Sequence, residues 1–91
     1  MLRAIDRQTL LTVARERIVS QLTGKEPDYP PRNPEVEIEG GAFVTLHLVR
    51  GGARSLRGCI GHIESLRPLY DTVRDTAYSA AFRDPRFPPL D

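Results

Sequence analysis

Two adjacent glycines, Gly51 and Gly52, restrict the fold of this 91-residue chain more than any other feature. They stand between two runs that are rich in strand-forming residues, 42–50 and 56–63. A glycine pair at such a place is typical of a β-hairpin turn, because glycine reaches the positive φ angles that the turn requires. The sequence therefore predicts an antiparallel hairpin over residues 42–63.

The length of this turn decides which hairpin residues share a face, because side chains alternate along a strand. A two-residue turn mixes polar and apolar side chains on both faces. A three-residue loop with a glycine bulge gathers an apolar face of Val44, Leu46, Leu48, Leu56 and Ile60. The opposite face then consists of Thr45, His47, Arg57, Cys59 and Gly61. We therefore expect the three-residue loop, with Cys59 opposite Thr45 and His47 opposite Arg57.

Helices are predicted over residues 6–23 and 68–82. Asp6 is a candidate N-cap and Gly24 a candidate C-terminal stop for the first helix. Its expected core-facing stripe is Leu11, Ala14, Ile18 and Leu22; that of the second helix is Leu69, Val73, Ala77 and Ala81. Prolines fill the connection 25–41, where residues 35–39 alternate like a short edge strand. The predicted fold class is α+β, with a mostly antiparallel sheet flanked by two helices.

The charge balance and the single cysteine exclude several classes of protein. With 13 basic and 12 acidic residues the net charge is +1, and the stretch 26–39 is acidic, so a nucleic-acid partner is not favoured. No apolar run is long enough to cross a membrane, and no leader opens the chain, so we expect a cytoplasmic protein without a membrane partner. One cysteine cannot form an internal disulfide.

The run Leu56-Arg57-Gly58-Cys59-Ile60-Gly61 resembles the signature of the AMMECR domain family. The turn Asp84-Pro85-Arg86-Phe87 resembles the block that follows the second helix of that family, and the resemblance covers essentially the whole chain. Family domains run to about twice this length. The resemblance therefore implies that residues 1–91 are one partial domain without its C-terminal half, a fragment of a two-subdomain fold with a cleft between the subdomains. Prokaryotic members accompany Memo-like and radical-SAM proteins, which the resemblance suggests as partners.

Cys59 is the sharpest candidate for chemistry, because a thiolate beside a cation is a strong nucleophile. Arg57 lies two residues away, and His47 is a weaker candidate base. The alternative is that Cys59 is a small buried hydrophobe. A metal site is not expected, because one cysteine and two histidines are too few for a closed zinc site. No cofactor is identified by the sequence.

Four further residues belong to the candidate ligand site. Gly58 and Gly61 match neither a P-loop nor a dinucleotide motif, and the expected role of Gly58 is close packing against the second helix or a partner. Asp84 can cap a turn and pair with Arg86, or Arg86 can join Arg57 at the rim of a cleft and hold an anion.

Three hypotheses for function follow. The first is an enzyme or accessory factor that binds or acts on a small anionic ligand in a cleft lined by Cys59 and Arg57. The second is a protein-interaction module that uses a cleft or a sheet edge, and the third is a nucleic-acid-binding module. An uncovered strand edge also predicts self-association, or contact with the C-terminal half of the domain.

Overall fold

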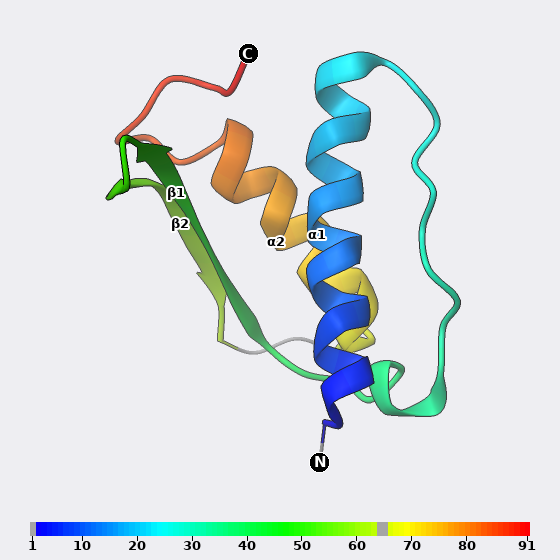
Figure 1. Ribbon diagram of the computed structural model, residues 1–91. Helices are drawn as coiled ribbons and strands as arrows, with labels where there is room; N and C mark the ends of the chain where they lie inside the picture. Colours follow the sequence, from blue (N-terminus) through cyan, green and yellow to red (C-terminus); the bar gives the residue numbers. More distant parts are fainter. Residues whose placement is uncertain (1, 64–65) are drawn as a thin grey trace.

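The computed structural model describes residues 2–63 and 66–91. The elements are, in order, helix α1 (Ala4–Thr23), 3-10 helix η1 (Pro34–Val36), strands β1 (Ala42–Arg50) and β2 (Ala53–His62), and helix α2 (Leu69–Phe82). The strands form a two-stranded antiparallel sheet, and α2 packs against both strands and against α1 (Figure 1). The predicted α+β class is therefore confirmed. Both predicted helices are present, with small differences at their first residues.

Helix α1 begins two residues earlier than the sequence predicts. Arg3 is the N-cap, and Asp6 occupies the third helical position, so the prediction that Asp6 is the N-cap is wrong. The Asp6 carboxylate reaches back and accepts a hydrogen bond from the Arg3 backbone N–H at 2.8 Å, which is one half of a capping box. At the other end Gly24 has φ 71°, the left-handed conformation expected of a residue that closes a helix.

The core lies between α1, η1 and α2 rather than under the whole length of α1. Val13, Val36 and Tyr70 are buried together. Leu11, which the periodicity assigns to the core stripe of α1, is 66% exposed. The assignment of Leu11 to the core is wrong because α2 packs against a neighbouring face of α1. Leu11 lies instead on the face of α1 that borders the hollows beside β1. The buried face of α2 was predicted correctly at Val73, Ala77 and Ala81.

The connection between α1 and β1 is tied to α2. The hydroxyl of Tyr70 donates a hydrogen bond to the carbonyl of Pro30 at 2.6 Å, and the guanidinium of Arg32 lies over the Tyr70 ring. The edge strand expected at residues 35–39 is wrong. Pro34–Val36 form a 3-10 turn capped by the Asn33 side chain, and only an isolated bridge between Glu39 and Pro68 has strand-like pairing.

The hairpin closes with a two-residue turn, so the predicted three-residue loop is wrong. Arg50 pairs with Ala53, and Gly51 and Gly52 have φ angles of 54° and 81°. Two consecutive positive φ angles are the signature of a type I′ turn, which matches the twist of the flanking strands. The odd residue expected in the loop is instead found inside β2, as a bulge.

The bulge at Arg57 restores part of the predicted register. Thr45 pairs with Cys59, as predicted, whereas His47 pairs with Leu56 and not with Arg57. Arg57 is the extra residue, because Leu46 pairs with Gly58 on one side of it. The bulge therefore moves Arg57 out of the ladder without changing the position of Cys59.

The sheet meets α2 at Gly58. A Cβ atom built at this residue would lie 2.1 Å from the carbonyl oxygen of Ala80, so a side chain has no room. Gly58 is itself buried. The predicted packing role of this glycine is confirmed, and it brings the backbone of β2 directly onto the C-terminal half of α2.

Candidate functional site

Cys59 lies half-buried in β2. Because side chains alternate along a strand and its neighbour Gly58 faces α2, Cys59 faces away from α2. Its Sγ atom is 3.3 Å from the Oγ1 atom of Thr45, its cross-strand neighbour. Both main-chain polar groups of Cys59 bind the segment after α2. The N–H donates to Oδ2 of Asp84 at 2.9 Å, and the carbonyl accepts from Nη2 of Arg86 at 3.3 Å. The sequence signature is thus held by the Asp84-Pro85-Arg86 turn, although the two are 25 residues apart.

The Asp84 carboxylate is the centre of this arrangement, and its side chain is only 2% exposed. Arg86 Nη2 lies 2.7 Å from Oδ2, and the Arg86 backbone N–H donates to Oδ1 at 3.0 Å. These bonds to Arg86, together with the N–H of Cys59, hold the pKa of Asp84 well below its usual range. Asp84 is therefore an ionised structural clasp between β2 and the chain after α2.

Arg57 and Arg86 converge on Phe87. Their guanidinium carbons lie 5.6 Å and 5.5 Å from the centre of the Phe87 ring. Arg57 Nη2 also donates a hydrogen bond to the carbonyl of Pro88 at 2.5 Å. The two arginines thus lie near the same ring, but each guanidinium already has a partner within the chain.

The remaining candidates lie further from this centre. His47 Nδ1 is 3.5 Å from Nη2 of Arg54, toward the hairpin turn. His62, at the other end of β2, has Nδ1 2.7 Å from the hydroxyl of buried Thr76. Gly61 lies under the ring of Phe43, where a Cβ atom would be 2.2 Å from ring carbons. The structure therefore groups Cys59 with Asp84 and Arg86 and places the histidines elsewhere.

Residues 2–63 and 66–91 offer neither a cluster of metal ligands nor a membrane-spanning helix. No group of three or more His, Cys, Asp or Glu side chains in this part of the chain could hold a metal ion. None of its helices is long and apolar enough to span a bilayer.

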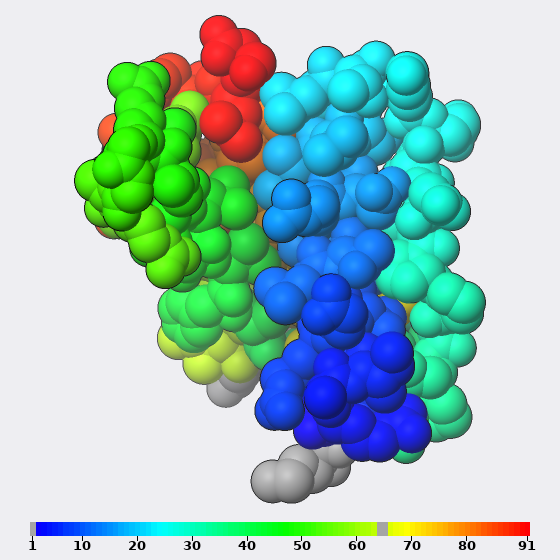
Figure 2. All heavy atoms as spheres, viewed as in Figure 1, coloured from blue at the N-terminus to red at the C-terminus, as the bar shows by residue number. Residues whose placement is uncertain are grey.

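A trough lies between α1 and β1, and we call it the α1–β1 trough. It consists of two adjoining hollows of about 490 and 500 Å³ that share lining residues of both elements. On the strand side it is bordered by every residue from 41 to 48, so residues from both faces of β1 take part. On the helix side it is bordered by residues from successive turns of α1: Arg7, Leu11, Ala14, Arg15 and Ile18. Figure 2 shows α1 in blue and β1 in green side by side on this face of the molecule.

Strand β1 turns an unpaired edge toward this trough. Its partner in the two-stranded sheet is β2, and the described residues contain no strand on its other side. Residues 41–48 of both parities border the hollows, which is the pattern of a strand seen from its edge. The hydrophobic stripe on α1 is visible in the sequence, but periodicity alone does not tell a face covered by its own core from one that borders an open trough.

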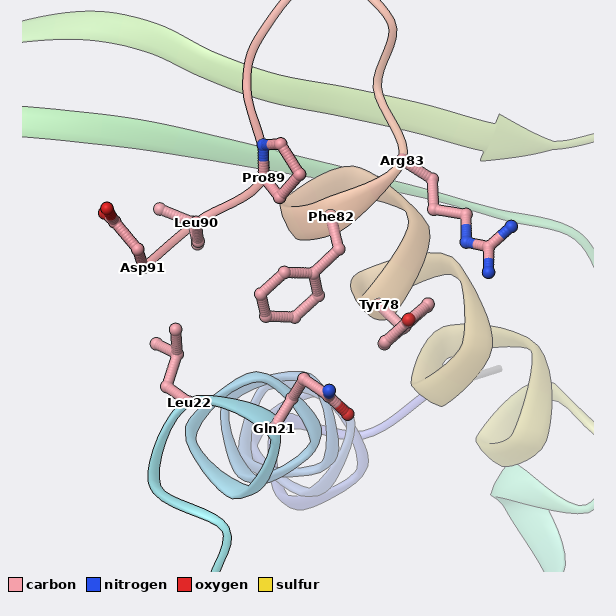
Figure 3. Close-up of a pocket in the computed structure, with 8 residues that line it drawn as sticks. All are labelled: Gln21, Leu22, Tyr78, Phe82, Arg83, Pro89, Leu90 and Asp91. Carbon is pink, nitrogen blue, oxygen red and sulfur yellow. The ribbon is translucent and has the colours of Figure 1, made fainter.

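A third hollow, of about 820 Å³, lies between the C-terminal ends of α1 and α2 and the last residues of the chain. The ring of Phe82 points into it, between Leu22 and the segment Pro89 to Asp91 (Figure 3). The Tyr78 ring, which also lines this hollow, lies beneath the guanidinium of Arg17. The hollow is wide and open and contains no cluster of reactive groups.

The fold and the clasp define a class of α+β unit: an antiparallel hairpin with a glycine contact to one helix, fastened by an aspartate that follows that helix. The AMMECR1 family model matches residues 11–91, which contain the signature, the clasp and most of α1. The chain belongs to the AMMECR1 family.

Several of the similar proteins come from archaea. A Saccharolobus islandicus protein is 42% identical over 82 residues, which are 89% of this chain and 36% of that protein. A Sulfolobus acidocaldarius protein is 49% identical over 59 residues, 65% of this chain and 26% of the relative. The crystal structure of an uncharacterised Pyrococcus horikoshii protein matches with a TM-score of 0.71 and 34% identity, covering 92% of this chain and 42% of that one. The chain thus spans about a third of the curated relatives that it matches.

Proposed function

We propose that this chain is a protein-binding module whose α1–β1 trough receives an extended polypeptide segment as an added strand. The single observation that carries this function is the unpaired edge of β1 along an apolar trough. An exposed strand edge presents a row of backbone donors and acceptors, and a strand added there satisfies them. The side chains of the added strand would pack against Leu11 and Ile18 of α1.

The occupant that we assign is a segment of an AMMECR1-type chain outside the matched region. More than half of the Pyrococcus horikoshii structure, and of the Saccharolobus islandicus protein, lies outside the match. Because the longer relatives contain such segments, the trough could be filled without a protein from another family. It would cover the 66% exposed side chain of Leu11, which otherwise stands in the middle of the trough.

Overlapping peptides that cover the unmatched part of the Saccharolobus islandicus protein test this function. At least one peptide should bind the 91-residue chain in fluorescence anisotropy, and Leu11→Gln should weaken that binding severalfold. Ile5→Gln is the matched control, because Ile5 lies on the same helix at 59% exposure and does not line the trough.

Two results would overturn the proposal. In the first, none of the peptides binds, or binding is indifferent to Leu11→Gln. In the second, the chain forms dimers in sedimentation experiments and Leu11→Gln dissociates them, which would assign the trough to a second copy.

A second candidate function is the binding of a small anionic ligand beside Cys59. The observation in its favour is the convergence of Arg57 and Arg86 on Phe87, next to the half-buried thiol. An anion would have to compete with the Asp84 carboxylate and the Pro88 carbonyl for these guanidiniums. Titration with inorganic phosphate, followed by NMR, should shift the side-chain signals of both arginines, and unchanged signals would refute this candidate.

A further inference from the structure

The charged side chains that line the α1–β1 trough are all arginines. Arg7 and Arg15 of α1 and Arg57 of β2 border it, and among the described residues no aspartate or glutamate does. Arg7 and Arg15 are exposed, and within residues 2–63 and 66–91 neither has an ion-pair partner. Other arginines are different: Arg32, Arg74 and Arg86, for example, each pair with a carboxylate.

The spacing on α1 fits an extended strand. Arg7, Leu11 and Arg15 follow one another at intervals of four residues, so they form one stripe along the helix. Four helical residues rise about 6.0 Å, and two strand residues advance about 6.6 Å. Alternate side chains of a strand beside β1 therefore come level with Arg7, Leu11 and Arg15 in turn.

From this match of charge and spacing we propose that the segment bound in the trough reads acidic, any residue, apolar, any residue, acidic. The central apolar side chain packs on Leu11, and the two carboxylates pair with Arg7 and Arg15. This inference rests on the proposed function and adds the chemistry by which the trough selects its occupant. Opposite charges at the rim of an interface select the partner and its register more than they add affinity.

Three designed peptides with identical lengths test the pattern. They contain the centre Glu-Thr-Leu-Thr-Glu, Gln-Thr-Leu-Thr-Gln or Lys-Thr-Leu-Thr-Lys, with threonine flanks and an amino-terminal fluorophore. At low salt the glutamate peptide should bind the 91-residue chain about tenfold or more tighter than the lysine peptide, and salt should reduce this preference. The glutamine peptide should bind with intermediate affinity.

A second experiment reverses a charge on the 91-residue chain instead of on the peptide. Arg15→Glu should remove or reverse the preference for the glutamate peptide. Lys25→Glu is the matched control: it changes the net charge by the same amount but lies outside the trough, in the connection after α1. At about 0.1 M salt it should leave the preference unchanged within about twofold, because charges farther apart than the Debye length of about 10 Å at that ionic strength are largely screened.

The outcomes separate the two proposals. Equal affinity for the glutamate and lysine peptides, or equal effects of Arg15→Glu and Lys25→Glu, would overturn the acidic pattern. Natural peptides that bind the trough without this pattern would overturn it too, and would leave strand addition standing. If none of the natural peptides binds, strand addition itself fails.

Discussion

The Asp84 carboxylate accepts a hydrogen bond from the backbone N–H of Cys59 at 2.9 Å and so joins the signature strand to the turn after α2. The same carboxylate pairs with Arg86 at 2.7 Å. Strand β2 is thus fastened by main-chain contacts at Cys59, whose thiol lies 3.3 Å from Oγ1 of Thr45 on the other strand.

Replacement of Asp84 by asparagine tests the clasp. Asp84→Asn keeps an acceptor for the Cys59 N–H but removes the charge that pairs with Arg86. We expect the thermal midpoint to fall by more than about 5 °C, because the side chain is only 2% exposed and Arg86 loses its partner. Asp75→Asn is the control, since the Asp75 side chain is 40% exposed and its ion pairs lie at the surface. Equal midpoints for the two variants would contradict the role of Asp84.

Acid should weaken the fold through the same carboxylate. The pKa of Asp84 is lowered in the folded state, so its ionised form stabilises the fold above the ordinary aspartate pKa of about 3.9. This stabilisation is lost as the pH falls toward the lowered folded-state pKa. Urea unfolding of the wild type should therefore become easier between about pH 5 and pH 3.

Asp84→Asn should show a shallower dependence on pH over the same range. Part of the dependence should remain, because the pKa values of Asp6 and Asp71 are also lowered, by hydrogen bonds from Arg3 and Arg32. Parallel profiles for wild type and variant would show that Asp84 does not carry the acid sensitivity.

Much of this fold follows from local sequence signals. The hairpin, both helices and the pairing of Thr45 with Cys59 could be predicted. The length of the turn could not be predicted, because the alternation of polar and apolar residues shows only which residues share a face of the hairpin. A two-residue turn with a bulge at Arg57 places Cys59 opposite the same partner as a three-residue loop does. The two solutions differ only between the turn and the bulge, where His47 faces Leu56.

The candidate site was harder to predict, because it depends on contacts distant in sequence. The pairing of Asp84 with Arg86 follows from their spacing, but nothing in the sequence places Asp84 on the N–H of Cys59. The trough was missed because an apolar stripe at Leu11 is equally compatible with a buried face. Only the position of α2 shows which stripe of α1 remains uncovered.

A single methyl group at Gly58 should disrupt the contact between sheet and helix. The new Cβ of Gly58→Ala would lie 2.1 Å from the Ala80 carbonyl oxygen, so backbone must move. We expect the free energy of unfolding to fall by about 1–3 kcal/mol, as it does in overpacked cores. In Gly40→Ala, the control, the nearest atom is 3.7 Å away, on the Leu69 side chain. A Gly58→Ala variant as stable as Gly40→Ala in urea would contradict this close approach.

The hairpin turn can be tested at one position with two substitutions. Gly51 has φ 54°, and a Cβ there meets nothing within 4 Å, so only backbone conformation matters. Asparagine tolerates this left-handed conformation, whereas valine does not. Gly51→Asn should be close to neutral, and Gly51→Val should lose about 1–2 kcal/mol in chemical unfolding. Equal stabilities would indicate a different turn.

The most direct test of strand addition at the α1–β1 trough is NMR of the isotope-labelled 91-residue chain with the unlabelled glutamate peptide. We predict intermolecular nuclear Overhauser effects between the peptide backbone and residues 43–47 of β1, and between the peptide leucine and Leu11. Amide exchange along β1 should slow at alternate residues, because a strand edge bonds through every second residue. Contacts of the peptide with β2 or with the hollow at Phe82, without any to β1, would contradict strand addition.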